Sequence, residues 1–221
     1  EKNKKSKLLN IGDSRTSAIS QGSSRILTEL NIWNKIGKKA QLINSILVKD
    51  GESSKIDFDS ELISEGPLGY IIENKILKEF VFNEVTKTSL INVYFDVDIN
   101  KIENQDQKIV KLKTNKGIFE SSLVVGADGR YSKTRELSNF KYSYNDYNQQ
   151  ALVFNISHQR SHNALAVEYF FPSGPLALLP MKNNKQKMSS VVWTVENSFK
   201  LDFRKKTTFF KAFENKYNGH F

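Results

Sequence analysis

Cysteine is absent from the 221-residue chain, which excludes disulfide bonds and thiolate metal sites. This absence suits a reducing compartment, so we expect a cytoplasmic protein. The sequence also has no apolar run near the roughly 20 residues that a membrane-spanning helix needs. Its three histidines share no metal-ligand or catalytic-triad spacing, and each is interpreted as an incidental surface or strand residue. We therefore predict no metal site.

Arginine is scarce relative to lysine. The net charge is +9, but only six of the 33 basic residues are arginine. Base recognition and bidentate phosphate binding favour arginine, and the lysines are scattered among many Asn and Ile residues. We therefore expect no nucleic-acid partner. The lysines are interpreted as a solvated surface, which is also compatible with peripheral contact at the inner face of an anionic membrane.

Helical and strand patterns alternate along the first part of the chain. The predicted helices cover 23–37, 74–85, a short segment from Ser132, and 207–221. The predicted strands cover a hairpin at 42–59 and the segments 90–99, 107–114, 117–127, 150–159, 164–172, 176–181 and 188–195. After Tyr144 the strands alternate and are linked by hairpins, which is typical of an antiparallel sheet. The fold class is therefore α/β with an α+β character.

The stretch "SLVVGADGRYSKTRE" compresses a strand, a turn and a helix start into a few residues. Residues 123–125 are predicted to form a short buried strand of a parallel sheet. Gly126 and Gly129 allow a sharp turn, and Ser132 is placed to cap a helix. Such a helix start suits a pyrophosphate, with Asp128 as an acceptor for sugar hydroxyls. The alternative is an ordinary strand–helix turn, in which Asp and Gly are common.

Two further motifs flank this stretch. Asp13, Arg15 and Ala18 form a D-x-R-x-x-A element, and residues 166–180 follow the pattern A-x-E-x-F-x-P-x-G-P-x-A-x-L-P. In this order, and together with the G-A-D-G turn, they resemble the class A flavin-dependent aromatic hydroxylases. The resemblance covers nearly the whole chain and is closest to the ubiquinone-biosynthesis branch.

The resemblance implies a fold like that of para-hydroxybenzoate hydroxylase. A partial Rossmann-type FAD domain would comprise residues 1–46 and 67–145. A mainly antiparallel substrate domain would comprise residues 47–66 and 146–221, so that the two domains are interleaved along the chain.

The resemblance also implies an activity. The protein would hydroxylate the aromatic ring of a polyprenylated phenol in ubiquinone biosynthesis, with FAD as cofactor, NAD(P)H as co-substrate and O₂, through a flavin C4a-hydroperoxide. Its partners would be this lipophilic substrate, O₂, and a membrane or a ubiquinone-biosynthesis complex. The alternatives are a flavoprotein reductase or halogenase of the same fold, or a non-enzymatic β-rich binding module.

Ten residues are carried over from the family motifs as site residues. The FAD-binding candidates are Glu1, Arg15, Asn74, Asp128, Gly129, Gly174 and Pro175. The substrate-binding candidates are Leu176 and Leu179, as one apolar wall that keeps water from the flavin, and Trp193. Alternatives stay open: Arg15 as a surface residue paired with Asp13, Asn74 as a helix cap, and Trp193 as core.

Two expected motifs are missing. No G-x-G-x-x-G occurs in the sequence, and the second G-D element of the family lies beyond its last residue. We therefore expect a fragment that binds FAD weakly on its own and is inactive alone. In that case Glu1 would be the acid that contacts the adenosine ribose.

Overall fold

The computed structural model describes residues 13–51, 54–105, 107–199 and 205–217. Within this part of the chain, residues 82–145 form one compact unit, and residues 13–81 with 146–217 form another. These units do not coincide with the predicted segments 1–46, 47–66, 67–145 and 146–221. The assignment of those segments to two interleaved domains stays a prediction.

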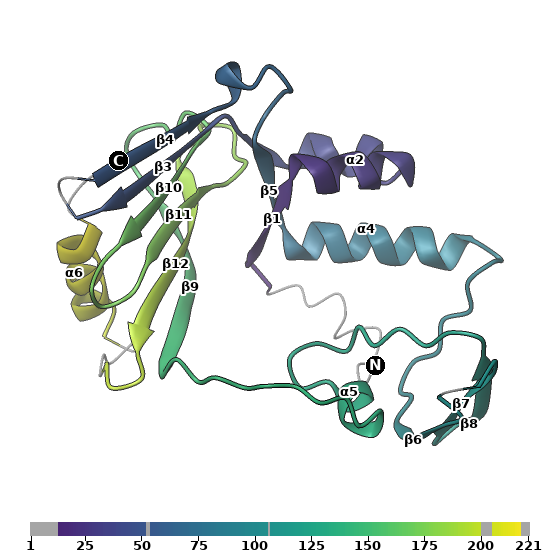
Figure 1. Cartoon of the computed structure of the whole chain (residues 1–221). Helices are drawn as coiled ribbons and strands as arrows, with labels where there is room; N and C mark the ends of the chain where they lie inside the picture. The colour runs from purple at the N-terminus through teal and green to yellow at the C-terminus, as the bar shows by residue number, and fades with distance from the viewer. Residues whose placement is uncertain (1–12, 52–53, 106, 200–204, 218–221) are drawn as a thin grey trace. The chain divides into compact units, whose positions relative to one another are not determined.

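A six-stranded sheet is the largest element of the second unit (Figure 1). Its strands run in the order β4-β3-β10-β11-β12-β9, and only β3 and β10 pair in parallel. The predicted mainly antiparallel sheet is thus confirmed. The strands are β3 (Ser45–Asp50), β4 (Ser54–Asp59), β9 (Gln149–Ser157), β10 (Leu165–Phe170), β11 (Leu176–Pro180) and β12 (Met188–Glu196).

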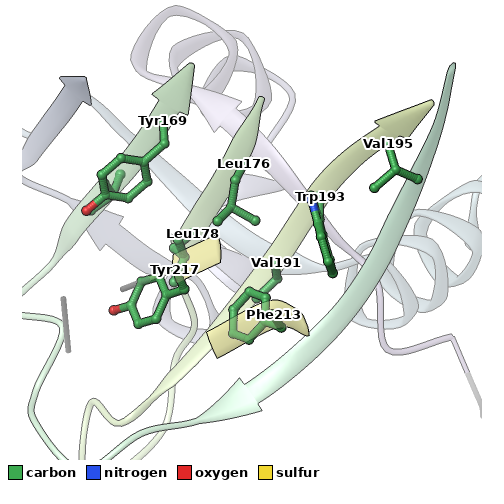
Figure 2. Packing of buried hydrophobic residues seen from close by; sticks show 9 residues of the cluster. Tyr169, Leu176, Leu178, Val191, Trp193, Val195, Phe213 and Tyr217 are labelled. Atoms are coloured by element: carbon green, nitrogen blue, oxygen red, sulfur yellow. The ribbon is translucent and has the colours of Figure 1, made fainter. Parts of the chain in front are cut away.

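One face of this sheet is covered by helix α6 (Lys206–Tyr217). Leu176, Val191 and Trp193 point from the sheet into a cluster that includes Phe213 and Tyr217 of the helix (Figure 2). Phe213 and Tyr217 stack with ring centroids 5.5 Å apart. Burial of these large apolar side chains on one face makes this layer the main core of the unit.

A small sheet packs against part of the opposite face. It consists of β1 (Thr16–Ser20), β5 (Gly69–Glu73) and β2 (Gln41–Ile43), in the order β1-β5-β2. Alternation along β5 sends neighbouring side chains to opposite sides. Ile71 packs on Ala166 of the large sheet, whereas Ile72 packs on the helix side with Ile36. The small sheet therefore lies between the large sheet and a helical layer.

The helical layer differs from the prediction in one respect. Helix α4 (Asn74–Lys87) confirms the helix predicted at 74–85, but the single helix predicted over 23–37 is two helices, α2 (Gln21–Glu29) and α3 (Trp33–Ile36). Asn31 has φ of 56°, a left-handed conformation that ends an α-helix. The 3.6-residue periodicity continues through this break, so it concealed the end of α2. No helix in the described ranges has the length and apolar character needed to cross a membrane.

The unit of residues 82–145 contains three antiparallel strands and one short helix. These are β6 (Ile99–Glu103), β7 (Val110–Thr114), β8 (Gly117–Ser121) and α5 (Lys133–Leu137). The predicted turn between β7 and β8 is confirmed, and Gly117 adopts φ of 115° there. The predicted helix from Ser132 is also confirmed as α5, and Ser132 caps it, because the Ser132 hydroxyl accepts a hydrogen bond from the backbone amide of Arg135.

Two predicted strands are wrong. Residues 90–98 form no strand, and β6 begins only at Ile99. The predicted buried strand at 123–125 lies in no ladder, and Leu123 and Val125 are 73% and 76% exposed. An apolar run becomes a strand only where a neighbour satisfies its backbone groups, and the described residues provide none here.

Candidate functional site

A buried carboxylate with two cations marks the start of β1. Asp13 accepts hydrogen bonds from the Arg15 side chain at 2.8 Å (Nε to Oδ1) and 2.9 Å (Nη2 to Oδ2). Lys78 Nζ, on α4, donates to Oδ2 at 3.0 Å. The alternative of an Arg15–Asp13 pair is thus realised, although Asp13 is buried while the Arg15 and Lys78 side chains are 62% and 46% exposed.

The electrostatics of this cluster leave positive charge facing solvent. The hydrogen bonds from Arg15 hold the pKa of the Asp13 carboxyl well below its usual range, and the bond from Lys78 adds to this effect against the opposing effect of burial. Asp13 in turn raises the pKa of Arg15. One carboxylate faces two permanent cations, so the cluster is suited to an anionic or electron-rich ligand group.

Side chains from two other elements hold this segment in place. Ser17 Oγ donates to the Asn74 side-chain oxygen Oδ1 at 2.6 Å. The backbone N–H of Asn74 donates to the Arg15 carbonyl at 2.9 Å. From the large sheet, Asn155 Nδ2 donates to the Ser14 carbonyl at 2.9 Å. The Asn74 side chain therefore bonds to β1. Whether it also faces a flavin stays a prediction.

Two buried polar atoms without a hydrogen-bond partner lie next to the hydrogen bond between Asn155 and Ser14. Ser190 on β12 is directly opposite Asn155 on β9, and neither Ser190 Oγ nor Asn155 Oδ1 has a partner within the described residues. Buried polar atoms in folded proteins are almost always hydrogen-bonded. The pair is therefore an incomplete site that a water molecule or a ligand group can complete.

The Gly174–Pro175 turn leads into β11. Gly174 has φ of 111°, and a Cβ atom placed there would lie 2.9 Å from the Thr194 carbonyl oxygen. The Pro175 carbonyl accepts a hydrogen bond from the Thr194 amide at 2.9 Å. Only glycine fits this conformation and this close approach. A cofactor contact of Gly174 and Pro175 stays a prediction.

The three substrate-binding candidates do not lie together. Leu176 and Trp193 are cross-strand partners in the core under α6, whereas Leu179 packs on the opposite face near Ala166. The single wall of Leu176 and Leu179 is therefore wrong. An offset of three residues along a strand places two side chains on opposite faces of the sheet.

Trp193 also lines a cavity of about 410 Å³ under the end of α6. The other lining residues include Ser173, Phe199 and Lys216. Lys216 bonds to Ser173 Oγ, and its Nζ lies 4.0 Å from the centroid of the Phe171 ring. Trp193 thus belongs to the core and to a cavity on the α6 side.

The Asp128 side chain, in the unit of residues 82–145, bonds to the start of helix α5. Its Oδ1 accepts from Ser132 Oγ at 2.5 Å and its Oδ2 accepts from the Thr134 amide at 2.9 Å. These bonds, led by that from Ser132, hold the pKa of Asp128 well below its usual range. Asp128 thus stabilises the start of α5, so its loss should destabilise this helix start. Gly129 has φ of 83° with open space where a Cβ would lie.

His162 differs from its predicted role. It was interpreted as an incidental surface or strand residue, yet it is buried, with 1% of its surface exposed. Its Nδ1 accepts from the Ala164 amide at 3.1 Å, and Nε2 lies 3.0 Å from the Met181 carbonyl, to which it therefore donates as a neutral ring. His162 joins the start of β10 to the end of β11.

The site contains two residues that were not predicted. Lys78 lies four residues after Asn74 on the same helix, a spacing that places both on one face, so this signal was present in the sequence. Asn155 is 141 residues from Ser14, and no local pattern connects them. Glu1, the predicted ribose ligand, lies outside the described residues.

Comparison with known proteins identifies relatives of the chain. The chain is 32% identical over 182 residues to the ubiquinone hydroxylase UbiL of Rhodospirillum rubrum, covering 82% of the chain and 42% of that protein. It is 24% identical to the 3-demethoxyubiquinol 3-hydroxylase of Escherichia coli, covering 82% of the chain and 46% of that protein. The chain thus spans less than half the length of these relatives.

A solved structure shares the fold. The p-nitrophenol 4-monooxygenase PnpA of Pseudomonas putida superposes with a TM-score of 0.72 at 12% identity, over 94% of this chain and 58% of that one. The predicted fold, like that of para-hydroxybenzoate hydroxylase, is thereby confirmed. A model of the family described as "FAD binding domain" matches residues 4–217. Because this match covers nearly the whole sequence, the chain belongs to the FAD binding domain family.

Proposed function

We propose that the protein is an FAD-dependent monooxygenase that hydroxylates the ring of a polyprenylated phenol in ubiquinone biosynthesis, using NAD(P)H and O₂. The observation that carries this proposal is the cluster of Asp13, Arg15 and Lys78 in a member of the FAD binding domain family. The named activities of UbiL and of the E. coli hydroxylase support the reaction class and the substrate class.

The residues present fit a bound FAD by the chemistry of their donors. Arg15 and Lys78 offer exposed cations, and Asp13 fixes the guanidinium by two bonds. A fixed guanidinium is well suited to a phosphate or to an electron-rich carbonyl. When bound, FAD would supply the redox chemistry, taking a hydride from NAD(P)H and delivering one oxygen atom of O₂ to the ring.

In this proposal the chain's own residues orient the cofactor and the substrate. Arg15 would contact FAD directly, and Asn74, Gly174 and Pro175 would line the same cofactor; Asn74 bonds to the Arg15 backbone. Asn155 acts as a positioning residue, because its bond to the Ser14 carbonyl fixes the backbone next to Arg15. Asp128 and Gly129 are proposed to border the dinucleotide through the backbone of their turn.

The proposal is tested on the full-length protein by measuring NAD(P)H oxidised, O₂ consumed and hydroxylated polyprenylphenol formed. We expect product in proportion to NAD(P)H. Flavin reduction without an oxygenated product across a panel of such phenols would reject the hydroxylase and favour a reductase.

A matched pair of variants tests the role of Arg15. Arg15→Ala should weaken FAD binding about tenfold, because a charged hydrogen bond contributes roughly 1.5 kcal/mol. Arg25→Ala is the control, since Arg25 is an exposed arginine paired with Glu65 on the surface. The dissociation constant of FAD is measured by fluorescence quenching, and equal effects of the two substitutions would contradict the assignment.

Peripheral contact with a membrane belongs to the same proposal. A lipid-tailed substrate is reached from a bilayer, and the net charge of +9 favours attraction to anionic headgroups. Co-sedimentation with vesicles containing phosphatidylglycerol, but not with pure phosphatidylcholine vesicles, is the expected result. Equal recovery in the supernatant with both vesicle types would contradict it.

A further inference from the structure

The face of the large sheet opposite α6 is divided into a covered part and an open part. Where β10 begins, Ala166 packs under Ile43 and Ile71 of the small sheet. Two residues further along the same face lies Glu168, directly opposite Val48 on β3 and Ala177 on β11. Residues paired across a ladder share a face, so these three side chains form one row just beyond the cover.

Apolar side chains surround this row and remain partly open to solvent. Phe170 follows Glu168 on the same face and is 48% exposed. Ile56 lies opposite Val48 on β4 and is also exposed, and Val192 lies opposite Ala177 on β12. Apolar and aromatic side chains around a single polar group are the usual lining for an aromatic ring with an apolar tail.

Glu168 is the anionic group in the middle of this surface. Within the described ranges its carboxylate has no hydrogen-bond or ion-pair partner. Burial raises its pKa above the ordinary range for glutamate. Among the neighbouring elements, the charged groups on this side include Asp50 at the end of β3, and Glu73, which pairs with Lys75 at 2.9 Å. They also include the Asp13–Arg15–Lys78 cluster, which is joined to this face by the hydrogen bond from Asn155 to the Ser14 carbonyl.

A purely structural role does not explain such a residue. A glutamate that stabilises a fold is normally paired or fully solvated, whereas a half-buried carboxylate without a partner opposes folding. Acids whose pKa is raised by apolar surroundings are frequent at ligand sites. The apolar surroundings of Glu168 on the sheet and its missing partner together point to a hydrogen-bond donor supplied by the ligand.

We propose that Glu168 accepts the hydrogen bond of the substrate's ring hydroxyl and takes its proton during hydroxylation. This inference rests on the proposed function and adds the residue that selects a phenol. The O–H bond of the phenol breaks, a new O–H bond forms on the Glu168 carboxylate, and the electron pair stays on the phenol oxygen. The resulting phenolate is richer in electrons at its ring, which favours attack by the ring on an electrophilic oxygen. As the C–O bond forms, the O–O bond of the oxygen donor breaks, and the hydrogen of the attacked ring carbon leaves as a proton to the oxygen that remains on the donor. The proton on Glu168 then returns to the original ring oxygen, so no further reactant is needed.

Binding without turnover provides the first test. The probes are 2-prenylphenol and its methyl ether, titrated into the FAD-loaded full-length protein without NAD(P)H. The wild type should prefer the phenol about tenfold, since a hydrogen bond to a charged group contributes roughly 1.5 kcal/mol. Glu168→Leu should abolish this preference, and Glu168→Gln should reduce it. An unchanged preference in Glu168→Leu would overturn the proposal.

The pH profile provides the second test. In the wild type, kcat/KM should fall at low pH as Glu168 becomes protonated. Glu168→Gln should lower kcat more than it raises KM, and it should remove this acid limb, whereas Glu168→Asp should restore part of it. Glu61→Gln is the control, because Glu61 is an exposed glutamate of the same unit. An acid limb that persists in Glu168→Gln would refute the role of Glu168.

The two proposals fail in different ways. If the wild type forms no hydroxylated phenol with any substrate of the panel, the proposed function fails. If the wild type hydroxylates phenols and Glu168→Gln has the same pH profile and probe preference, the function stands and the inference about Glu168 is rejected.

Discussion

The two faces of the six-stranded sheet are built from the same strands but have different environments. The α6 face buries Leu176, Leu178 and Trp193 in one cluster. On the opposite face, the neighbouring side chains in sequence are Leu179, which packs with the small sheet, and Ala177, which belongs to the row at Glu168. Each strand thus supplies core on one side and a partly open surface on the other.

This difference separates stability from recognition at the level of single residues. A substitution on the α6 face removes contacts that are complete within the chain. A substitution on the other face, beyond the small sheet, changes a surface with an unpartnered acid and exposed aromatic groups. Strand alternation is therefore the rule that assigns motif residues 166–180 to one role or the other.

The largest effect should come from shortening a leucine on the α6 face. Leu176→Ala should lower the free energy of unfolding by about 3 kcal/mol, because Leu176 is fully buried and a cavity would remain. Leu179→Ala should cost about half as much, since Leu179 is only partly buried. Both losses of stability are measured by urea denaturation, with tryptophan fluorescence as the signal. A larger loss for Leu179→Ala would contradict the assignment of the faces.

The turn that enters β11 should give the next largest effect. Gly174→Ala should cost about 2 kcal/mol, because φ of 111° is unfavourable for alanine and the new Cβ would lie 2.9 Å from the Thr194 carbonyl oxygen. Gly51→Ala is the control for φ alone, since Gly51 has φ of 62° and no atom within 4 Å of the added Cβ. Equal losses for the two variants would show that the contact with Thr194 does not matter.

The sequence predicted the parts of the fold that local patterns determine. The strands after residue 149 alternate strongly and are joined by hairpins, so their pairing is local. The run at 123–125 has the composition of a strand, but strand formation depends on a distant partner that periodicity does not reveal. The break at Asn31 was concealed because the apolar spacing continues across it.

The candidate site divides in the same way. Asp13 and Arg15 are two residues apart, and their contact follows from a local spacing. Lys78 follows Asn74 by one helical turn, a signal that the sequence contained. The bond from Asn155 to Ser14 joins segments 141 residues apart, so only the tertiary structure reveals it. Since Leu176 and Leu179 lie three residues apart in one predicted strand, strand alternation already predicted that they face opposite sides of the sheet.

A buried histidine should give a smaller effect that depends on pH. Burial lowers the pKa of His162 from its ordinary value near 6.5, so the unfolded chain binds a proton at a higher pH than the folded chain does. Stability should therefore fall as the pH decreases below about 6.5, by an amount on the order of 1 kcal/mol. His162→Gln can keep both hydrogen bonds without titrating, and it should reduce this loss between pH 7 and pH 5. A variant with the same pH dependence as the wild type would show that other groups cause the loss.

The smallest effect should be a gain in stability on the open face. Glu168 has a raised pKa because burial disfavours its charged form, so the folded state holds this proton more tightly than the unfolded state. Its destabilising effect is absent below the unfolded pKa near 4.5 and develops as the pH rises through the folded pKa. Glu168→Gln should therefore stabilise the protein by about 0.5 kcal/mol at pH 8 and by nothing measurable at pH 4. Glu61→Gln, on the exposed surface, should change neither value. Urea midpoints at the two pH values measure the difference, and a loss of stability in Glu168→Gln at pH 8 would mean that the carboxylate supports the fold. A gain would mean that this acid is kept at a cost to stability, as expected for a group whose partner is the substrate.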